Sequence, residues 1–381
     1  MAKNKSCSSK CQDRLNKVGG QAVLEGVMMK AGAKTVTTCR KEDGTLAVYD
    51  SEFHSVRKKH KILNIPILRG VINFVEMLIL SVKTLGFSAD ALGIEEEDGK
   101  CEKWLKKHLG IKLTDLIMII SVILGLALSV FLFMFLPNFI SGLIDKFLLK
   151  GALGVWTAVV EGFVKILIFL AYLWLVSLMS DIKRTFMYHG AEHKSIACFE
   201  SGDELTPENA KKYKRFHPRC GTSFMFLMIL LGIFAGLFVK IAIPGLNTFA
   251  YTGIRLLILP LVMGIGYEIL MIAGKHDNFL TRAISAPGLW VQRITTKEPT
   301  EDMLEVAIIS IKCALRDDFP EFREFWEARP WETKPEADKD AAESEAAEAE
   351  ISLDESASAE EVGESTEENA VSAVKESEND A

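Results

Sequence analysis

An uninterrupted apolar stretch constrains the fold of this chain more than any other feature. Residues 116–136 contain 21 consecutive uncharged side chains. At about 1.5 Å of rise per residue, a helix of this length crosses a hydrocarbon core of about 30 Å. Because a bilayer offers no partners to backbone amides and carbonyls, the stretch predicts a transmembrane helix. We therefore expect a mainly α-helical, polytopic membrane protein that contacts membrane lipids.

Three further apolar stretches raise the expected number of transmembrane helices to about four. They cover residues 155–180, 221–239 and 256–273. The first of them carries Glu161 and Lys165, four residues apart, near its expected outer end. Residues 71–82 are also apolar, but charged side chains bracket or interrupt them. This pattern favours a helix that lies on the membrane surface or packs on the protein.

The distribution of basic residues predicts the orientation. Residues 181–220 hold eight lysines and arginines, whereas the loops around Asp145 and Pro244 are short and weakly charged. We expect this segment and both termini to be cytosolic, in a multi-pass protein of the inner (plasma) membrane, with no cleavable signal sequence. The seven cysteines are then expected to be reduced thiols.

The C-terminal residues 332–381 differ from the rest of the chain. They contain eighteen acidic residues, three lysines and no aromatic residue, so this tail should be disordered. The net charge of this tail is −15. Because the whole chain has a net charge of −7, the other 331 residues have a net charge of +8. The folded part is basic, yet we expect no DNA binding.

The soluble parts show recognisable local patterns. Residues 34–40 and 45–49 predict a β-hairpin, and residues 301–315, after a capping Thr300, predict a helix with one apolar face. Residues 285–293 are typical of an amphipathic turn, and residues 319–331 of a last docked helix. The expected organisation is a flexible segment 1–16, an α/β segment 17–113, a four-helix membrane domain 114–275 with its loop 181–220, a helical segment 276–331 and the tail 332–381.

The sequence His189-Gly-Ala-Glu192-His193 is the strongest candidate for chemistry. On a helix over residues 188–197, the two imidazoles would stand one turn apart on one face. Glu192 would lie beside them, within hydrogen-bonding range of a bound water. The motif predicts a two-histidine metal clamp with a candidate general base. The alternative is a surface helix whose histidines are four residues apart by chance.

A second donor cluster is His217-Pro-Arg219-Cys220-Gly221. A histidine and a cysteine with two residues between them in a Pro/Gly turn can face one ion. The alternative is a turn with an inert thiol. Since residues 189–193 follow the second predicted span and this turn precedes the third, a short antiparallel hairpin would bring the clusters together.

Glu268 is a lone carboxylate in the fourth predicted span. An acid inside a membrane is costly unless it is paired or binds a cation, so it is a functional candidate. Gly264 and Gly266 would allow a neighbouring helix or a ligand to approach closely. The alternative is an ion pair with Arg69 or Lys275.

Six motifs in order carry a resemblance to a known family. They are Gly19-Gly-Gln-Ala-Val-Leu-Glu25-Gly-Val-Met-Met29, Leu68-Arg69-Gly70, Tyr188-His-Gly-Ala-Glu-His-Lys194, His217-Pro-Arg-Cys-Gly-Thr-Ser-Phe224, Gly266-Tyr-Glu268 and Ala286-Pro-Gly-Leu-Trp-Val-Gln-Arg-Ile-Thr-Thr-Lys-Glu-Pro299. Over residues 17–315 the chain resembles the YqhQ family. The resemblance implies a bacterial inner-membrane protein of a kind labelled a predicted metal-dependent enzyme, with no established reaction.

The leading hypothesis is an integral membrane protein with a cytosol-facing site for Zn²⁺ or a similar divalent ion. The metal ligands would be His189, His193 and either His217 or Cys220. If the protein is an enzyme, Glu192 or Glu25 would act as general base on a metal-bound water, and hydrolysis of an amphiphilic substrate is the favoured class. Glu268, Arg69 and Arg219 are further candidate site residues.

Two other classes of function stay open. One is a non-catalytic scaffold or membrane-protein biogenesis factor, whose basic loop and acidic tail recruit ribosomes, a translocon or anionic lipid. The other is a transporter subunit, since Glu161, Lys165 and Glu268 are ionisable groups inside spans. A homo-oligomer could then form the pathway.

Overall fold

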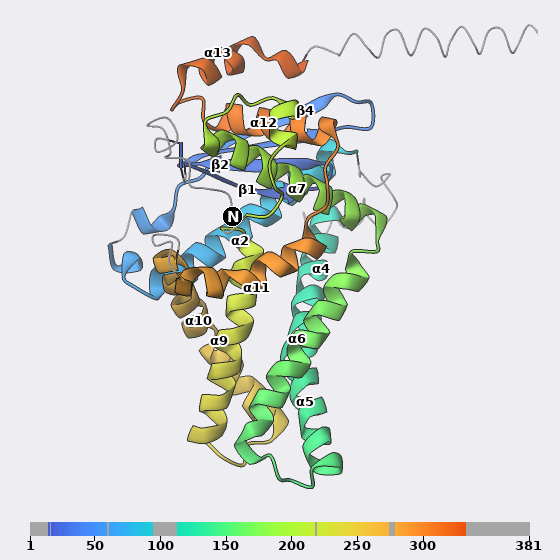
Figure 1. Ribbon diagram of the computed structural model, residues 1–381, viewed down its shortest axis with the longest axis vertical. Coiled ribbons are helices and arrows are strands. Elements are labelled where there is room, and N and C mark those ends of the chain that lie inside the picture. Colours follow the sequence, from blue (N-terminus) through green and yellow to red (C-terminus); the bar gives the residue numbers. More distant parts are fainter. Residues whose placement is uncertain are drawn as a thin grey trace, which may run out of the picture. The chain divides into compact units, whose positions relative to one another are not determined.

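The computed structural model describes residues 14–15, 17–58, 61–93, 113–217, 219–273 and 279–332 (Figure 1). The chain divides into two compact units at Ala328, and the elements from β1 to α13 all belong to the first. Two of the expectations fall largely or wholly outside the described residues. These are the flexible segment 1–16 and, beyond Glu332, the acidic tail.

A four-stranded antiparallel sheet forms the N-terminal part of the described chain. Its strands are β1 (Val18–Val23), β2 (Gly26–Ala31), β3 (Lys34–Arg40) and β4 (Leu46–Glu52), and each pairs with the next along the sequence. The expected hairpin is therefore confirmed as β3 and β4. Residues 18–31, which precede this hairpin, form two further strands that the sequence pattern did not predict.

Helices cover both faces of this sheet (Figure 1). Successive strand residues point to opposite faces, and Gln21 and Gly20 of β1 illustrate the two layers. Gln21 donates to Thr84 and accepts from Ser81 of α2 (Leu68–Ala91). Gly20 instead lies against Glu192 of α7 (Ser180–Ser201). The helix predicted over residues 301–315 is α12 (Glu301–Ala314), which packs on β2 and β3.

Five of the described helical stretches are long and apolar enough to cross a membrane. They are Leu68–Ala91 (α2), Ile119–Leu148, Gly154–Val176, Phe224–Ala242 and Thr248–Ile272. The second stretch joins α4 (Leu113–Val130) and α5 (Leu136–Leu143) through π-helical turns, and the other three correspond to α6 (Thr157–Val176), α9 (Gly221–Ala242) and α10 (Thr248–Ala273). The exposed leucines and isoleucines of α4 fit a lipid environment, because water disfavours an apolar surface of this size.

Three local expectations need correction. The helix α10 begins at Thr248, eight residues before the expected span, and so includes Arg255. This early start is possible because the arginine is buried against Glu161 of α6. Residues 285–293 are not a turn but belong to α11 (Phe279–Thr295), which contains Pro287. Thr300 precedes α12, but its side chain makes no capping hydrogen bond. The last docked helix is α13 (Pro320–Ala328).

Two glycines allow α2 and α10 to cross closely. A Cβ atom on Gly264 would lie 2.5 Å from the carbonyl oxygen of Ile67, and one on Gly70 would lie 2.7 Å from the Cβ of Tyr267. Beside this crossing, Arg69 donates to Glu268 from Nε at 2.7 Å. Close backbone packing and an ion pair thus join α2, which packs on the sheet, to α10.

We predict that Gly264→Ala lowers the thermal unfolding temperature of the detergent-solubilised protein, because the backbone at Ile67 would have to move. The matched control is Gly253→Ala on the same helix, where an added Cβ would meet no atom within 4 Å. In a helix interior, replacing glycine by alanine is intrinsically favourable by about 1 kcal/mol. The control should therefore unfold at the same or a higher temperature than the wild type. Equal unfolding temperatures of the two variants would contradict the close crossing of α2 and α10.

A candidate metal centre on helix α7

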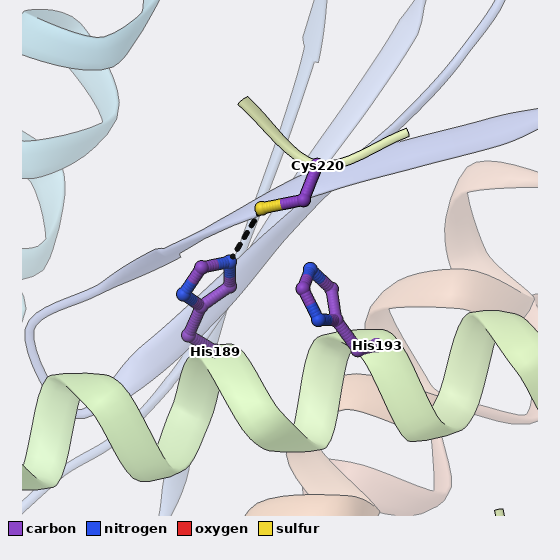
Figure 2. Close-up of side chains that lie close together, drawn as sticks. All are labelled: His189, His193 and Cys220. Atoms are coloured by element: carbon purple, nitrogen blue, oxygen red, sulfur yellow. Dashed lines mark hydrogen bonds between the residues drawn. The ribbon is translucent and has the colours of Figure 1, made fainter. Parts of the chain in front are cut away.

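The helix α7 presents the two motif histidines to a cysteine from another part of the chain (Figure 2). His189 and His193 lie one turn apart, as the spacing predicted, and Cys220 lies just before α9. The donor atoms of the three residues all lie within 4.8 Å of one another. Within the group, His189 Nε2 lies 3.2 Å from Cys220 Sγ. The expected meeting of the two motifs therefore occurs in the structure.

Backbone carbonyls fix which nitrogen of each histidine faces the cysteine. His189 Nδ1 lies 2.9 Å from the carbonyl oxygen of Thr295, and His193 Nδ1 lies 2.5 Å from that of Arg215. A carbonyl only accepts hydrogen bonds, so each Nδ1 carries the proton and each Nε2 keeps its lone pair. This is the arrangement in which metal-binding histidines are normally held. Burial also lowers the pKa of His193, which favours the neutral form that binds metal.

The segment around Lys297 packs closely against α7 and so holds the Thr295 carbonyl beside His189. The segment after α11 runs along the helix, where the Lys297 amide donates to the Phe186 carbonyl at 2.8 Å. A Cβ on Gly190 would lie 2.0 Å from the Lys297 oxygen, so a larger residue would displace this segment. The buried Lys194 adds an ion pair with Glu298. Gly190 therefore helps to orient His189, because it allows this segment to lie close to the helix.

Glu192 lies between the two histidines in sequence and is 5% exposed. Its Oε2 atom has no hydrogen-bond partner among the residues that the structure describes. Burial raises the pKa of this carboxyl group, whereas the charges of His189 and His217 and the Gly20 backbone lower it. A buried carboxylate oxygen without a partner is costly for folding, so it indicates a ligand or a proton as its partner in function.

His217 approaches the cluster without joining the converging donors. Its ring centroid lies 5.6 Å from that of His193. Its Nδ1 accepts a long hydrogen bond of 3.4 Å from the Arg219 amide, and its Nε2 lies 3.8 Å from Glu200. Arg219 itself is ion-paired with Glu200. Of the two ligands left open by the sequence, the structure therefore places Cys220, rather than His217, in the three-donor group.

The other acidic candidates are engaged elsewhere. Glu25 lies at the β1–β2 turn and accepts two hydrogen bonds of 2.5 Å from Arg184. Glu268 is paired with Arg69 on α2, which was the structural alternative considered for it. Lys275, its other suggested partner, lies outside the described residues. Neither carboxylate is in the three-donor group, and both join separate elements of the fold.

Sequence reasoning missed the residues that support the cluster. Gln292 is fully buried on α11, donates to the His217 carbonyl and accepts from the His217 amide, both at 2.8 Å. Thr295 and Arg215 act through their carbonyl oxygens, which no side-chain pattern reveals. The signal that could have identified Gln292 is an amide on an otherwise apolar helix face, within one of the quoted motifs.

Thiol reactivity provides a test of this arrangement. Burial raises the pKa of Cys39 and Cys313 to about 12 and that of Cys198 to about 11, whereas Cys220 is only partly buried. At pH 8 a thiol with a pKa of 11 is ionised to about one part in a thousand, and the thiolate is the reactive form. We predict that N-ethylmaleimide labels Cys220 at least about tenfold faster than the other three.

The labelling is measured by peptide mass spectrometry in a variant with Cys7, Cys11 and Cys101 replaced by serine, because these three lie outside the described residues. Before labelling, the protein is treated with a chelator so that any metal is removed. A urea-denatured sample, in which all four thiols should react, is the control. Labelling of the native protein at Cys198 or Cys313 as fast as at Cys220 would contradict the burial described above.

Comparisons with known proteins identify relatives without an assigned activity. Residues 65–317 match the model of a family described as a protein of unknown function, DUF1385. The chain is also 35% identical over 305 residues to the uncharacterized protein YqhQ of Bacillus subtilis strain 168. That alignment covers 78% of this chain and 92% of the relative. No solved structure matches the chain significantly.

Proposed function

The chain belongs to the DUF1385 family, and we propose that it is an integral membrane protein that binds a divalent metal, most suitably zinc, through His189, His193 and Cys220. The observation that carries this proposal is the convergence of two Nε2 lone pairs and one thiol sulfur. Imidazole nitrogen and thiolate sulfur are the donors that zinc prefers. Carboxylate-preferring ions such as magnesium and calcium fit this set poorly.

The geometry agrees with the size of the ion. Zinc bonds of about 2.1 Å to nitrogen and 2.3 Å to sulfur imply ligand separations of roughly 3.3–3.8 Å in a tetrahedron. The observed 3.2 Å between His189 Nε2 and Cys220 Sγ is close to this range, and all three donor atoms lie within 4.8 Å of one another. Small side-chain rotations would bring all three atoms to bonding distance. Three protein ligands also leave one position open, as in catalytic zinc sites.

We further propose that the metal serves hydrolysis, with Glu192 as the general base. A zinc ion at this site would supply Lewis acidity toward a water and toward the substrate's carbonyl or phosphoryl oxygen. The Glu192 Oε2, buried and without a partner among the described residues, is available to accept a proton from that water. Burial raises the pKa of this carboxyl group, which makes it a stronger proton acceptor than an exposed glutamate.

The position of α2 supports an amphiphilic substrate. Its C-terminal half packs on the sheet, while Phe74, Leu78, Ile79 and Leu85 remain exposed. We propose that α2 lies at the membrane surface, as the charges around residues 71–82 suggested, and that the other four candidate helices cross the bilayer. The sheet and the metal cluster would then lie against the cytosolic face, within reach of a substrate whose apolar part stays in the membrane.

Metal analysis of the detergent-purified full chain tests the metal site. We expect about one zinc per chain in the wild type and its loss in His189→Ala, His193→Ala and Cys220→Ser, because tetrahedral zinc needs these donors. His54→Ala removes an exposed histidine outside the cluster and should retain the metal. His217→Ala should also retain it, since its ring lies outside the three-donor group. A wild type without stoichiometric metal would remove the proposal.

The role of Glu192 is tested by Glu192→Gln, with Glu208→Gln on an exposed helix position as the matched control. Both variants should keep the metal, because neither carboxylate is in the three-donor group. Loss of a general base costs about 100- to 10,000-fold in rate, so turnover of lipids in a membrane extract should fall by this factor in Glu192→Gln alone. Products are followed by mass spectrometry. Equal turnover in the two variants would exclude Glu192 as the base.

A non-catalytic scaffold is the second candidate, because the same three donors tie α7 to the segment before α9. A structural zinc site is closed by four protein ligands, whereas a catalytic site keeps a water. A crystal structure of the zinc-loaded protein separates the two. A water as the fourth ligand supports the hydrolase, and a fourth protein ligand together with absent turnover supports the scaffold.

A further inference from the structure

A second polar cluster lies among the membrane helices, separate from the metal centre. Glu161 on α6 is ion-paired with Arg255 on α10 and accepts a hydrogen bond of 3.1 Å from the Tyr251 hydroxyl. Lys165 Nζ lies 3.7 Å from the same carboxylate, and Lys240 Nζ of α9 lies 3.8 Å from it. One carboxylate therefore faces three cations contributed by three different helices.

The cluster is deeply buried and carries an excess of positive charge. Glu161 is 2% exposed, Lys165 5% and Arg255 6%. Asp145 acts on Lys240 from a greater distance, and its carboxylate accepts the Leu153 amide. Even with Asp145 counted, the described groups leave one surplus positive charge. Uncompensated charge is costly inside a bilayer, so the surplus calls for an anion.

Lys165 is the cation with unused hydrogen-bonding capacity. Lys240 donates to the Thr157 hydroxyl at 2.8 Å, and Arg255 donates to the Gly232 carbonyl at 3.0 Å. Lys165 faces the Glu161 carboxylate at 3.7 Å, and the structure shows no second acceptor for its ammonium group among the described residues. An ammonium group has three donors. Its buried, largely unused donors are therefore available to an acceptor that enters the cluster.

The cluster lies where the phosphates of a bilayer leaflet can be reached. Thr157 is the first residue of α6, Lys240 is in the last turn of α9, and Tyr251 is in the first turn of α10. These ends of the helices lie at the opposite end of the membrane helices from the sheet (Figure 1). Lysine and arginine side chains near such ends extend toward the headgroups, and both recognise phosphate.

We propose that Lys165, Lys240 and Arg255 form a binding site for the phosphate of an anionic phospholipid, in the leaflet opposite the sheet. The headgroup phosphate supplies the missing negative charge and accepts hydrogen bonds from Lys165. Glu161 holds the three cations in place, and the Tyr251 hydroxyl orients Glu161. This site does not depend on the metal centre, since α6, α9 and α10 supply all of its groups.

The test uses the full chain, delipidated in a nonionic detergent, and measures its thermal unfolding during titration with dihexanoyl phosphatidylglycerol. We expect a saturable rise in unfolding temperature for the wild type. In Lys165→Met the midpoint concentration should rise at least about tenfold, as expected for the loss of one charge-assisted hydrogen bond. Lys146→Met, which removes an exposed lysine from the π-helical turn Ile144–Leu148 after α5, should titrate like the wild type.

Parallel titrations identify the source of the phosphate, and a second variant keeps the test valid if Lys165→Met does not fold. Dihexanoyl phosphatidylcholine and inorganic phosphate are titrated in parallel and should give much smaller shifts. An equal shift with inorganic phosphate would overturn the lipid assignment in favour of a free anion. Lys240→Met, at a more exposed position, replaces Lys165→Met if the latter does not fold. The same titration curve in wild type and cluster variant, or no shift at all, would overturn the proposal.

Discussion

The candidate site depends on two hydrogen bonds from histidine rings to backbone carbonyls. Without the carbonyls of Thr295 and Arg215, each imidazole could rotate or adopt the other tautomer, and its Nε2 lone pair would not be held toward Cys220. Both carbonyls lie outside α7, one at the last residue of α11 and one before α9. The geometry of the donors is therefore a product of the tertiary fold and not of α7 alone.

This dependence explains several residues that touch none of the three donors. Gly190 allows the segment at Lys297 to lie against α7, and Gln292 holds the backbone at His217. Gly20 allows β1 to approach the side chain of Glu192. Each of these residues permits or fixes a close backbone approach. Their effect on the site is one of position, because they bring backbone segments within hydrogen-bonding distance of the functional side chains.

The sequence predicted those features that arise from local periodicity or spacing. The helix that carries His189 and His193, the hairpin of β3 and β4, and the apolar helices follow from patterns within about twenty residues. The strands β1 and β2 were not predicted, because their pairing depends on partners in the sheet. Arg255 was excluded from the fourth span for a related reason. A charge ends an apolar stretch in sequence, but Glu161 on another helix compensates it in the fold.

Cys220 occupies a position at which other residue types would stabilise the helix. It is the N-cap residue of α9, yet its side chain makes no capping hydrogen bond. Serine, threonine, aspartate or asparagine at such a position stabilises a helix by about 1 kcal/mol relative to alanine. A cysteine at this position therefore stabilises the helix less than a serine of similar size would. Its thiolate is, however, a good metal ligand, and the helix N-terminus favours this negatively charged form. The absence of a cap hydrogen bond at Cys220 therefore supports the proposal that its side chain is a metal ligand.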